Sequence, residues 1–210
     1  HTPHTDWFTK SANGGLIEPS GNEKAAIYKK IYTDCVSACS DKGCIGSFVF
    51  LWGWQSHGDV LNWYAMYDQF EASALPTVEA MEEMWTGKAP MNSAPVIASR
   101  EDGKTGGKIY IDGRTSDQSI ALAHGSQHMA SVDATDPDGD ELTYDWKIIP
   151  DVRLDNGKAM SPIAGLFTGK MGAQVNFKAP SATGYYRLIV YVRDKAHGTA
   201  SCAVIPFKVN

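Results

Sequence analysis

The sequence is short of positive charge in its first part and contains no long hydrophobic run. Residues 1–90 contain six lysines, no arginine and eleven acidic residues, whereas residues 91–210 contain thirteen charges of each sign. The longest nearly uncharged apolar run, Cys44 to Trp54, is too short for a membrane-spanning helix. The formal net charge is −5, with no basic patch. We therefore expect no membrane span and no nucleic-acid partner, because nucleic-acid binding needs concentrated positive charge.

The chain also lacks an initial methionine, a charged leader and an apolar signal segment, since it opens His-Thr-Pro-His. We therefore expect a processed, excised or incomplete chain. No Asn-x-Ser/Thr sequence is present, so N-linked glycans are not expected.

Tryptophan is distributed as unevenly as charge. Five of the six tryptophans precede residue 90, and only Trp146 follows it. This contrast in charge and tryptophan content between the two parts of a 210-residue chain predicts two domains. We place the first domain at residues 1–90, a proline-containing linker at 91–97 and the second domain at 98–210.

Local signals in the first part predict a helix, a buried strand, a long loop and a second helix. Ser20 and Glu23 form a capping box at a helix start, and Gly43 marks a helix end. The run Cys44 to Trp54 is continuous, apolar and rich in β-branched and aromatic residues, which favours a strand buried on both faces. A second helix is predicted from Pro76 to Gly87. This order is typical of an α/β protein.

Aromatic residues gather where the predicted strand gives way to its loop. Ligands of α/β folds bind beyond the carboxyl ends of strands, and flat aromatic faces suit sugar rings. The alternative is that these tryptophans pack in the core or at a domain interface. The candidate carbohydrate-binding residues are Trp52, Trp54, Trp63 and Gln55.

Several segments of the first part resemble the last portion of a (β/α)8-barrel glycoside hydrolase, of the bacterial type related to family 2 glycosidases. They include IEPSGNEKAAIYKKIY, GSFVFLWGW, NWYAMYD and MWTGKAP. The resemblance covers about residues 5–97. It implies that Cys44–Trp52 is the eighth barrel strand, that Trp52 belongs to the aromatic wall of a sugar site, and that both catalytic carboxylates lie upstream of His1. No catalytic residue is therefore assigned, and this chain alone is predicted to be inactive.

The acidic residues of the second predicted helix have a simpler interpretation. Glu79 and Glu83 are four residues apart and share one helix face. We expect this face to be solvated rather than catalytic.

The second part changes to alternating apolar and polar residues, with turn residues between short runs. This pattern predicts an all-β, immunoglobulin-like sandwich in which Trp146 fills the space between two sheets. The predicted strands are Pro95–Ser99, Lys108–Ile111, Gln127–Ala134, Leu142–Ile149, Ala173–Lys178, Tyr185–Arg193 and Ser201–Val209. The motifs DPDGD, LTYDW and YVRD resemble polycystic-kidney-disease type and cadherin-like domains, over residues 94–210.

Acidic residues concentrate around the DPDGD motif and offer hard oxygen ligands for calcium. The alternative is a tight turn in which aspartate side chains cap backbone amides. No cofactor is required by either interpretation, and calcium would be structural. The candidate metal ligands are Asp133, Asp136, Asp138, Asp140 and Asp194.

Three of the four cysteines cluster in the first part. Cys39 with Cys44, or Cys35 with Cys44, would staple the helix end to the following segment in an oxidising compartment; three buried free thiols are the alternative. Cys202 alternates with apolar residues and is predicted to be core filler.

Together these observations predict the C-terminal part of a secreted, periplasmic or cell-surface carbohydrate-active protein. Its partners would be carbohydrate, and an upstream barrel region or another protein chain covering the open barrel edge. The alternative function is a non-catalytic extracellular module for binding or assembly.

Overall fold

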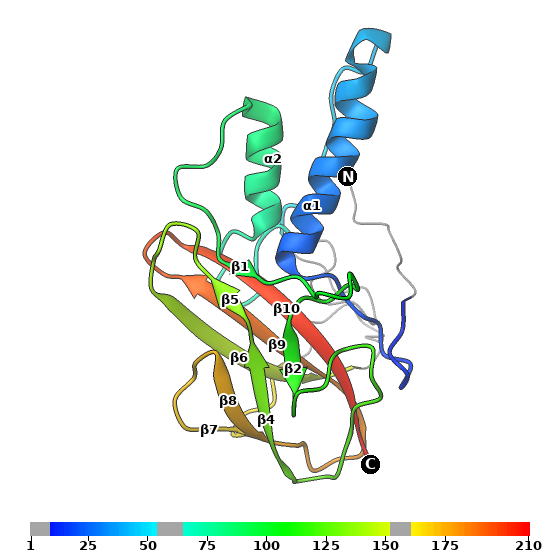
Figure 1. The fold of residues 1–210 in the computed structure, drawn as a ribbon, viewed down its shortest axis with the longest axis vertical. Helices are drawn as coiled ribbons and strands as arrows, with labels where there is room; N and C mark the ends of the chain where they lie inside the picture. Colours follow the sequence, from blue (N-terminus) through cyan, green and yellow to red (C-terminus); the bar gives the residue numbers. More distant parts are fainter. Residues whose placement is uncertain (1–8, 54–64, 152–160) are drawn as a thin grey trace.

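The computed structural model describes residues 9–53, 65–151 and 161–210. Two four-stranded sheets dominate the described chain (Figure 1), with strand orders β3-β10-β9-β6 and β2-β4-β8-β7. Neighbouring strands are antiparallel except for β3 and β10, which are parallel. A short third sheet pairs β1 with β5.

Two α-helices precede the strands in sequence. Their bounds and those of the strands are α1 Gly21–Ile31, α2 Pro76–Thr86, β1 Val96–Ile97, β2 Ile109–Ile111, β3 Ala121–Leu122, β4 Gln127–Val132, β5 Ala134–Thr135, β6 Leu142–Pro150, β7 Phe167–Thr168, β8 Gln174–Lys178, β9 Gly184–Asp194 and β10 Thr199–Val209.

The main hydrophobic core lies between the two four-stranded sheets. Side chains alternate between the two faces of a strand, so Leu188, Val190 and Val192 of β9 point into this core. Trp146 of β6 lies in the same core, as predicted, and its Nε1 donates a hydrogen bond to the Gly172 carbonyl at 2.9 Å. The all-β part of the predicted fold therefore fits in part, with strands close to the expected positions.

The other face of the β3-β10-β9-β6 sheet is also buried. Ile189 and Tyr191 of β9, with Val204 of β10, form a second core with Ala65 and Leu75. Residues from the first part of the chain therefore cover the outer face of the sandwich. This double burial explains why β9 and β10 are almost continuously apolar.

Two buried groups of charges lie where the first part meets this outer face. Arg193 Nη1 is 2.8 Å from Asp68 Oδ2. Arg187 Nε is 2.9 Å from Asp151 Oδ1, and its Nη1 is 3.6 Å from Glu18 Oε2. Because isolated buried charges are very costly, these contacts fix how the first part is seated on β9.

Both helices begin at the predicted signals and α2 ends at Gly87, whereas α1 ends at Ile31, before the predicted Gly43. Ser20 and Glu23 form both hydrogen bonds of the capping box at the start of α1. Beyond α1 the chain continues through π-helical and 3₁₀ turns to Gly43, whose φ is 89°. The two helices rise from one end of the sandwich (Figure 1) and share a small core that includes Tyr28 and Met81.

The α/β half of the predicted fold class, the end of a (β/α)8 barrel, is wrong. Within the described residues, Cys44–Gly53 forms no strand and belongs to no sheet. Ile45 and Phe48 of this run are exposed. A strand needs hydrogen-bonding neighbours, and the described strands lie instead in the sheets formed by residues 96–209. Hydrophobicity alone therefore did not make this run a strand.

Residues 91–97, predicted as a linker, end in β1, which pairs with β5. No helix of the described ranges meets the length and apolarity needed to cross a membrane.

Candidate functional site

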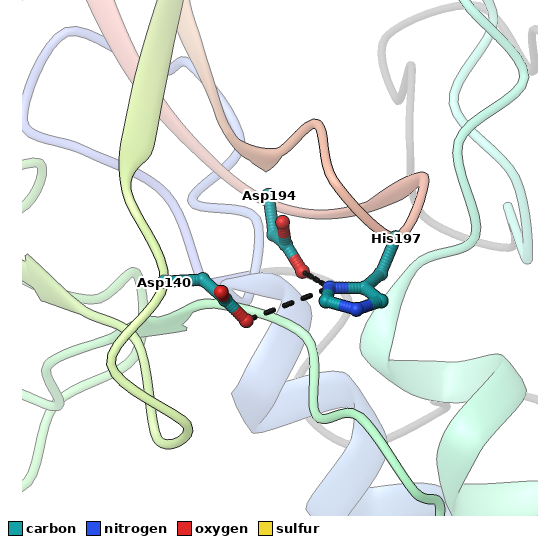
Figure 2. A group of neighbouring side chains, drawn as sticks. All are labelled: Asp140, Asp194 and His197. Atoms are coloured by element: carbon teal, nitrogen blue, oxygen red, sulfur yellow. Dashed lines mark hydrogen bonds and ion pairs between the residues drawn. The ribbon is translucent and has the colours of Figure 1, made fainter.

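Two aspartates and a histidine converge at the tight hairpin between β9 and β10 (Figure 2). Asp194 ends β9, and its Oδ1 accepts the amide of Ala196 at 2.9 Å, which fixes the turn. His197 Nδ1 lies 2.9 Å from Asp194 Oδ2 and 3.5 Å from Asp140 Oδ2. Figure 2 shows both carboxylates approaching the same imidazole nitrogen.

The charges of this group support one another. The hydrogen bond to Asp194 raises the pKa of His197, and the charges of Asp194 and Asp140 act in the same direction. Burial works to raise the pKa of Asp194, but hydrogen bonds from His197, Asn92 and the Ala196 amide outweigh it and lower that pKa. A protonated His197 therefore joins two carboxylates that would otherwise repel each other.

The remaining predicted metal ligands serve the turn or lie apart from this group. Asp136 Oδ1 accepts the amides of Asp138 and Asp140 at 2.9 and 3.2 Å. Asp138 Oδ2 accepts the Ser93 amide at 2.7 Å. Asp133 is exposed between β4 and β5. The structure thus brings together Asp140 and Asp194 of the five candidates, and it gives Asp136 the capping role of the turn alternative.

The ligand atoms of Asp140, Asp194 and His197 all lie within 4.8 Å of one another. Calcium prefers oxygen ligands only, whereas an imidazole nitrogen with carboxylates also suits a borderline cation such as zinc. A cation would have to replace the proton that His197 shares with the two acids. Calcium binding by the aspartates stays a prediction.

The segment after α2 is held by three carboxylates from three different elements. Asn92 Nδ2 donates to Asp194 Oδ2 at 3.0 Å, the Ser93 amide donates to Asp138, and the Ala94 amide donates to Glu79 of α2. This arrangement connects α2, the DPDGD turn and the β9–β10 hairpin.

Glu79 lies in a cleft of about 400 Å³ between α1, α2 and this segment. Burial raises its pKa to about 7, against the lowering effects of the Ala94 amide and Lys29. Glu79 is therefore half-buried, and the expected solvated face holds only in part. Glu83 is partly exposed and pairs with Lys29, as a surface residue would.

The predicted carbohydrate-binding residues are only partly described. Trp54, Gln55 and Trp63 lie outside the described residues. Trp52 is 51% exposed and lies beside Trp85, at the last turn of α2, which is 43% exposed. The ring centroids are 6.0 Å apart and the planes are tilted by 55°. The described chain thus presents two adjacent, half-exposed indole rings.

Sequence reasoning missed His197 and Trp85 as members of these groups. His197 follows Asp194 by three residues in a short connection between two predicted strands, and this spacing was the available signal. Trp85 lies within the predicted second helix, and its partner Trp52 is 33 residues away in the sequence.

Neither a protein-family model nor a curated protein matches this sequence. Among solved structures, similarity is found to a nucleoside hydrolase-related hypothetical protein from Saccharophagus degradans that is associated with carbohydrate metabolism. The TM-score is 0.35 and the identity 17%, over 63% of this chain and 29% of that one. The soluble domain of PmoD from Methylocystis sp. has a TM-score of 0.30 and 18% identity, over 49% of this chain and 90% of that one. This chain therefore spans less than a third of the first protein's length, and both similarities are too remote to assign a fold or function.

Proposed function

We propose that this chain is a non-catalytic, carbohydrate-binding part of a carbohydrate-active protein that works outside the cytoplasm. The observation that supports it is the pair of half-exposed rings, Trp52 and Trp85, at the helical end of the molecule. The catalytic carboxylates of a glycosidase are assigned to no residue of this chain.

The exposure of both rings favours a ligand over simple packing. Burying a large apolar side chain fully is worth about 1.5–3 kcal/mol, and each indole here forgoes a sizeable part of that stabilisation. A sugar ring presents an apolar face of C–H groups, and stacking it on an indole would cover this surface while its hydroxyls stay hydrated.

The tilt between the two rings also suits a sugar, which offers a flat face to one ring and an edge to the other. Because the planes are tilted by 55°, one ring would stack on a sugar while the other flanks its edge. Trp85 is held by a well-anchored helix, since Ala80 and Met81 of α2 are buried and Gly87 ends it in the left-handed conformation. A preorganised ring loses little freedom on binding.

The proposal can be tested by affinity electrophoresis in gels that contain soluble hydroxyethylcellulose, xylan or laminarin. We expect at least one polysaccharide to retard the wild-type chain. Trp52→Ala and Trp85→Ala should each weaken the affinity derived from that retardation about tenfold, as expected for the loss of about 1.4 kcal/mol of stacking. Tyr185→Ala is the matched control, because Tyr185 is a similarly exposed aromatic residue at the far end of β9.

Retardation that survives both tryptophan substitutions would contradict the proposal, as would the absence of binding to every polysaccharide tested. Light scattering distinguishes carbohydrate binding from the alternative function in assembly. Self-association of the wild-type chain that is lost in Trp52→Ala would assign these rings to assembly.

A further inference from the structure

Three of the four cysteines lie around the helix end that precedes the exposed run. Cys35 lies in the π-helical turn, Cys39 in the 3₁₀ turn, and Cys44 directly after Gly43. All three are free thiols, with Cys35 exposed and the other two half-buried. Cys202 differs, because burial in β10 raises the pKa of its thiol to about 11, which makes it unreactive.

The backbone brings Cys39 and Cys44 together. Gly43 has a φ of 89° and its amide donates to the Cys39 carbonyl. The amide of Cys44 donates to the same carbonyl at 3.2 Å. In the Schellman ending of a helix, a residue in the left-handed conformation is followed by one whose amide donates to the carbonyl five positions earlier. The side chains of the first and sixth residues of this motif commonly touch. Cys39 and Cys44 occupy these two positions, and in the reduced chain the Cys44 thiol donates to the Gly46 carbonyl at 3.6 Å.

We propose that Cys39 and Cys44 form a disulfide that closes this helix end. Disulfides need neighbouring backbones whose Cβ atoms approach each other, and the Schellman hydrogen bond supplies that proximity. Cys35 lies one turn earlier, about 6 Å further along the helix axis, and no described hydrogen bond links it to Cys44. The pairing is therefore Cys39–Cys44 rather than Cys35–Cys44.

The chemistry is thiol–disulfide exchange with a small disulfide oxidant such as oxidised glutathione. One cysteine thiolate attacks the oxidant's S–S bond, forms a mixed disulfide and releases one glutathione thiolate. The second cysteine thiolate then attacks the mixed disulfide and releases the other. The two cysteines lose two protons and two electrons, and the oxidant is reduced to two thiols.

The bridge would hold the start of the run that leads to Trp52 against the helix end. This inference does not depend on carbohydrate binding, because it rests only on the geometry around Gly43.

The test is peptide mapping of the whole chain after equilibration with oxidised and reduced glutathione. Trypsin cleaves after Lys30, Lys42 and Lys88, so residues 31–42 carry Cys35 and Cys39 while residues 43–88 carry Cys44. Without reduction, we expect these two peptides to stay linked. Thiol titration of the unfolded chain should fall from four thiols to two.

Single substitutions identify the pair. The link should persist in Cys35→Ser and be lost in Cys39→Ser and Cys44→Ser. Hydrogen exchange at the Cys44 amide should be slower in the oxidised wild-type chain than in the reduced one. A link that persists in Cys39→Ser but is lost in Cys35→Ser would overturn the proposal. So would the absence of any link, under oxidising glutathione, in a chain that circular dichroism shows to be folded.

Discussion

Arg193 and Asp68 form an ion pair that is almost completely removed from solvent, with their side chains 2% and 0% exposed and Nη1 2.8 Å from Oδ2. The two residues are 125 positions apart in the sequence. Asp68 also accepts the amides of Phe70, Glu71 and Ser73. One carboxylate therefore both shapes the segment that covers the sheet and fixes it to β9.

We expect Asp68→Asn to lower the free energy of unfolding by up to about 3–5 kcal/mol. It removes the carboxylate nearest to the buried Arg193 and leaves only the longer contacts to Asp145, at 3.3 Å, and to Glu71, at 3.6 Å. Urea denaturation measures this directly. Asp34→Asn is the control, because Asp34 forms an exposed ion pair with Lys30, and its loss should have no measurable effect. Equal stability of Asp68→Asn and the wild type would show that the buried pair does not hold the two parts together.

Glu79→Gln should stabilise the protein at neutral and alkaline pH. Burial raises the pKa of Glu79 from 4.5 to about 7, so the folded state binds this proton more tightly than the unfolded state does. The contribution of Glu79 to stability is therefore present at low pH and declines as the pH rises from 4.5 through about 7. Glutamine stays neutral and can still accept the Ala94 amide.

The measurement is urea denaturation at pH 5 and pH 8, with Glu83→Gln as the control on the same helix. The stabilising effect of Glu79→Gln should be clear at pH 8 and smaller at pH 5. If Glu79→Gln lowered stability equally at both pH values, the charge of Glu79 would not destabilise the folded protein.

His197→Gln should destabilise the β9–β10 hairpin, and more so in acid than in alkali. The pKa of His197 is raised by its hydrogen bond to Asp194, so its stabilising contribution is present below the ordinary value of 6.5 and is lost as the pH rises through the raised value. Melting temperatures of the wild type and the variant should therefore converge at pH 9. Parallel curves from pH 6 to pH 9 would contradict an ionic role for this histidine.

The calcium prediction can be tested with the same measurement. If calcium binds, it should raise the melting temperature relative to a chelator-treated sample, and Asp194→Asn should abolish the rise. Asp133→Asn is the matched control, because Asp133 is exposed and outside the converging group. If calcium leaves the melting temperature of the wild type unchanged, the predicted calcium site does not exist.

Signals that act over a few residues were read correctly from the sequence. The capping box at Ser20 and Glu23, the proline at the start of α2 and the glycines that end the helices all act through bonds within one turn. Strands β2, β4, β6, β8, β9 and β10 also lie close to their predicted positions, because short runs of strand-forming residues between turn residues mark them. The two-residue strands β3 and β7 were not predicted.

Two continuous apolar runs looked alike in the sequence but differ in the structure. The run in β9 is a central strand, because β10 and β6 hydrogen-bond to it on either side, and its two faces are covered by the sandwich core and by residues of the first part. The run from Cys44 to Gly53 joins none of the sheets formed by the described residues. Apolar composition shows that a segment avoids water, but it does not show which elements pair with it. The convergence of His197 with Asp140 was missed for the same reason, because it depends on how two loops meet.

The double burial of the β3-β10-β9-β6 sheet has a practical consequence for anyone who shortens the chain. A polypeptide that began at residue 91 would lack Ala65 and Leu75, which cover Ile189, Tyr191 and Val204. It would also lack Asp68, the buried partner of Arg193. Such a truncated product would expose an apolar sheet face and leave Arg193 with Asp145 as its remaining carboxylate partner. It would be recovered as insoluble aggregate unless that face were redesigned.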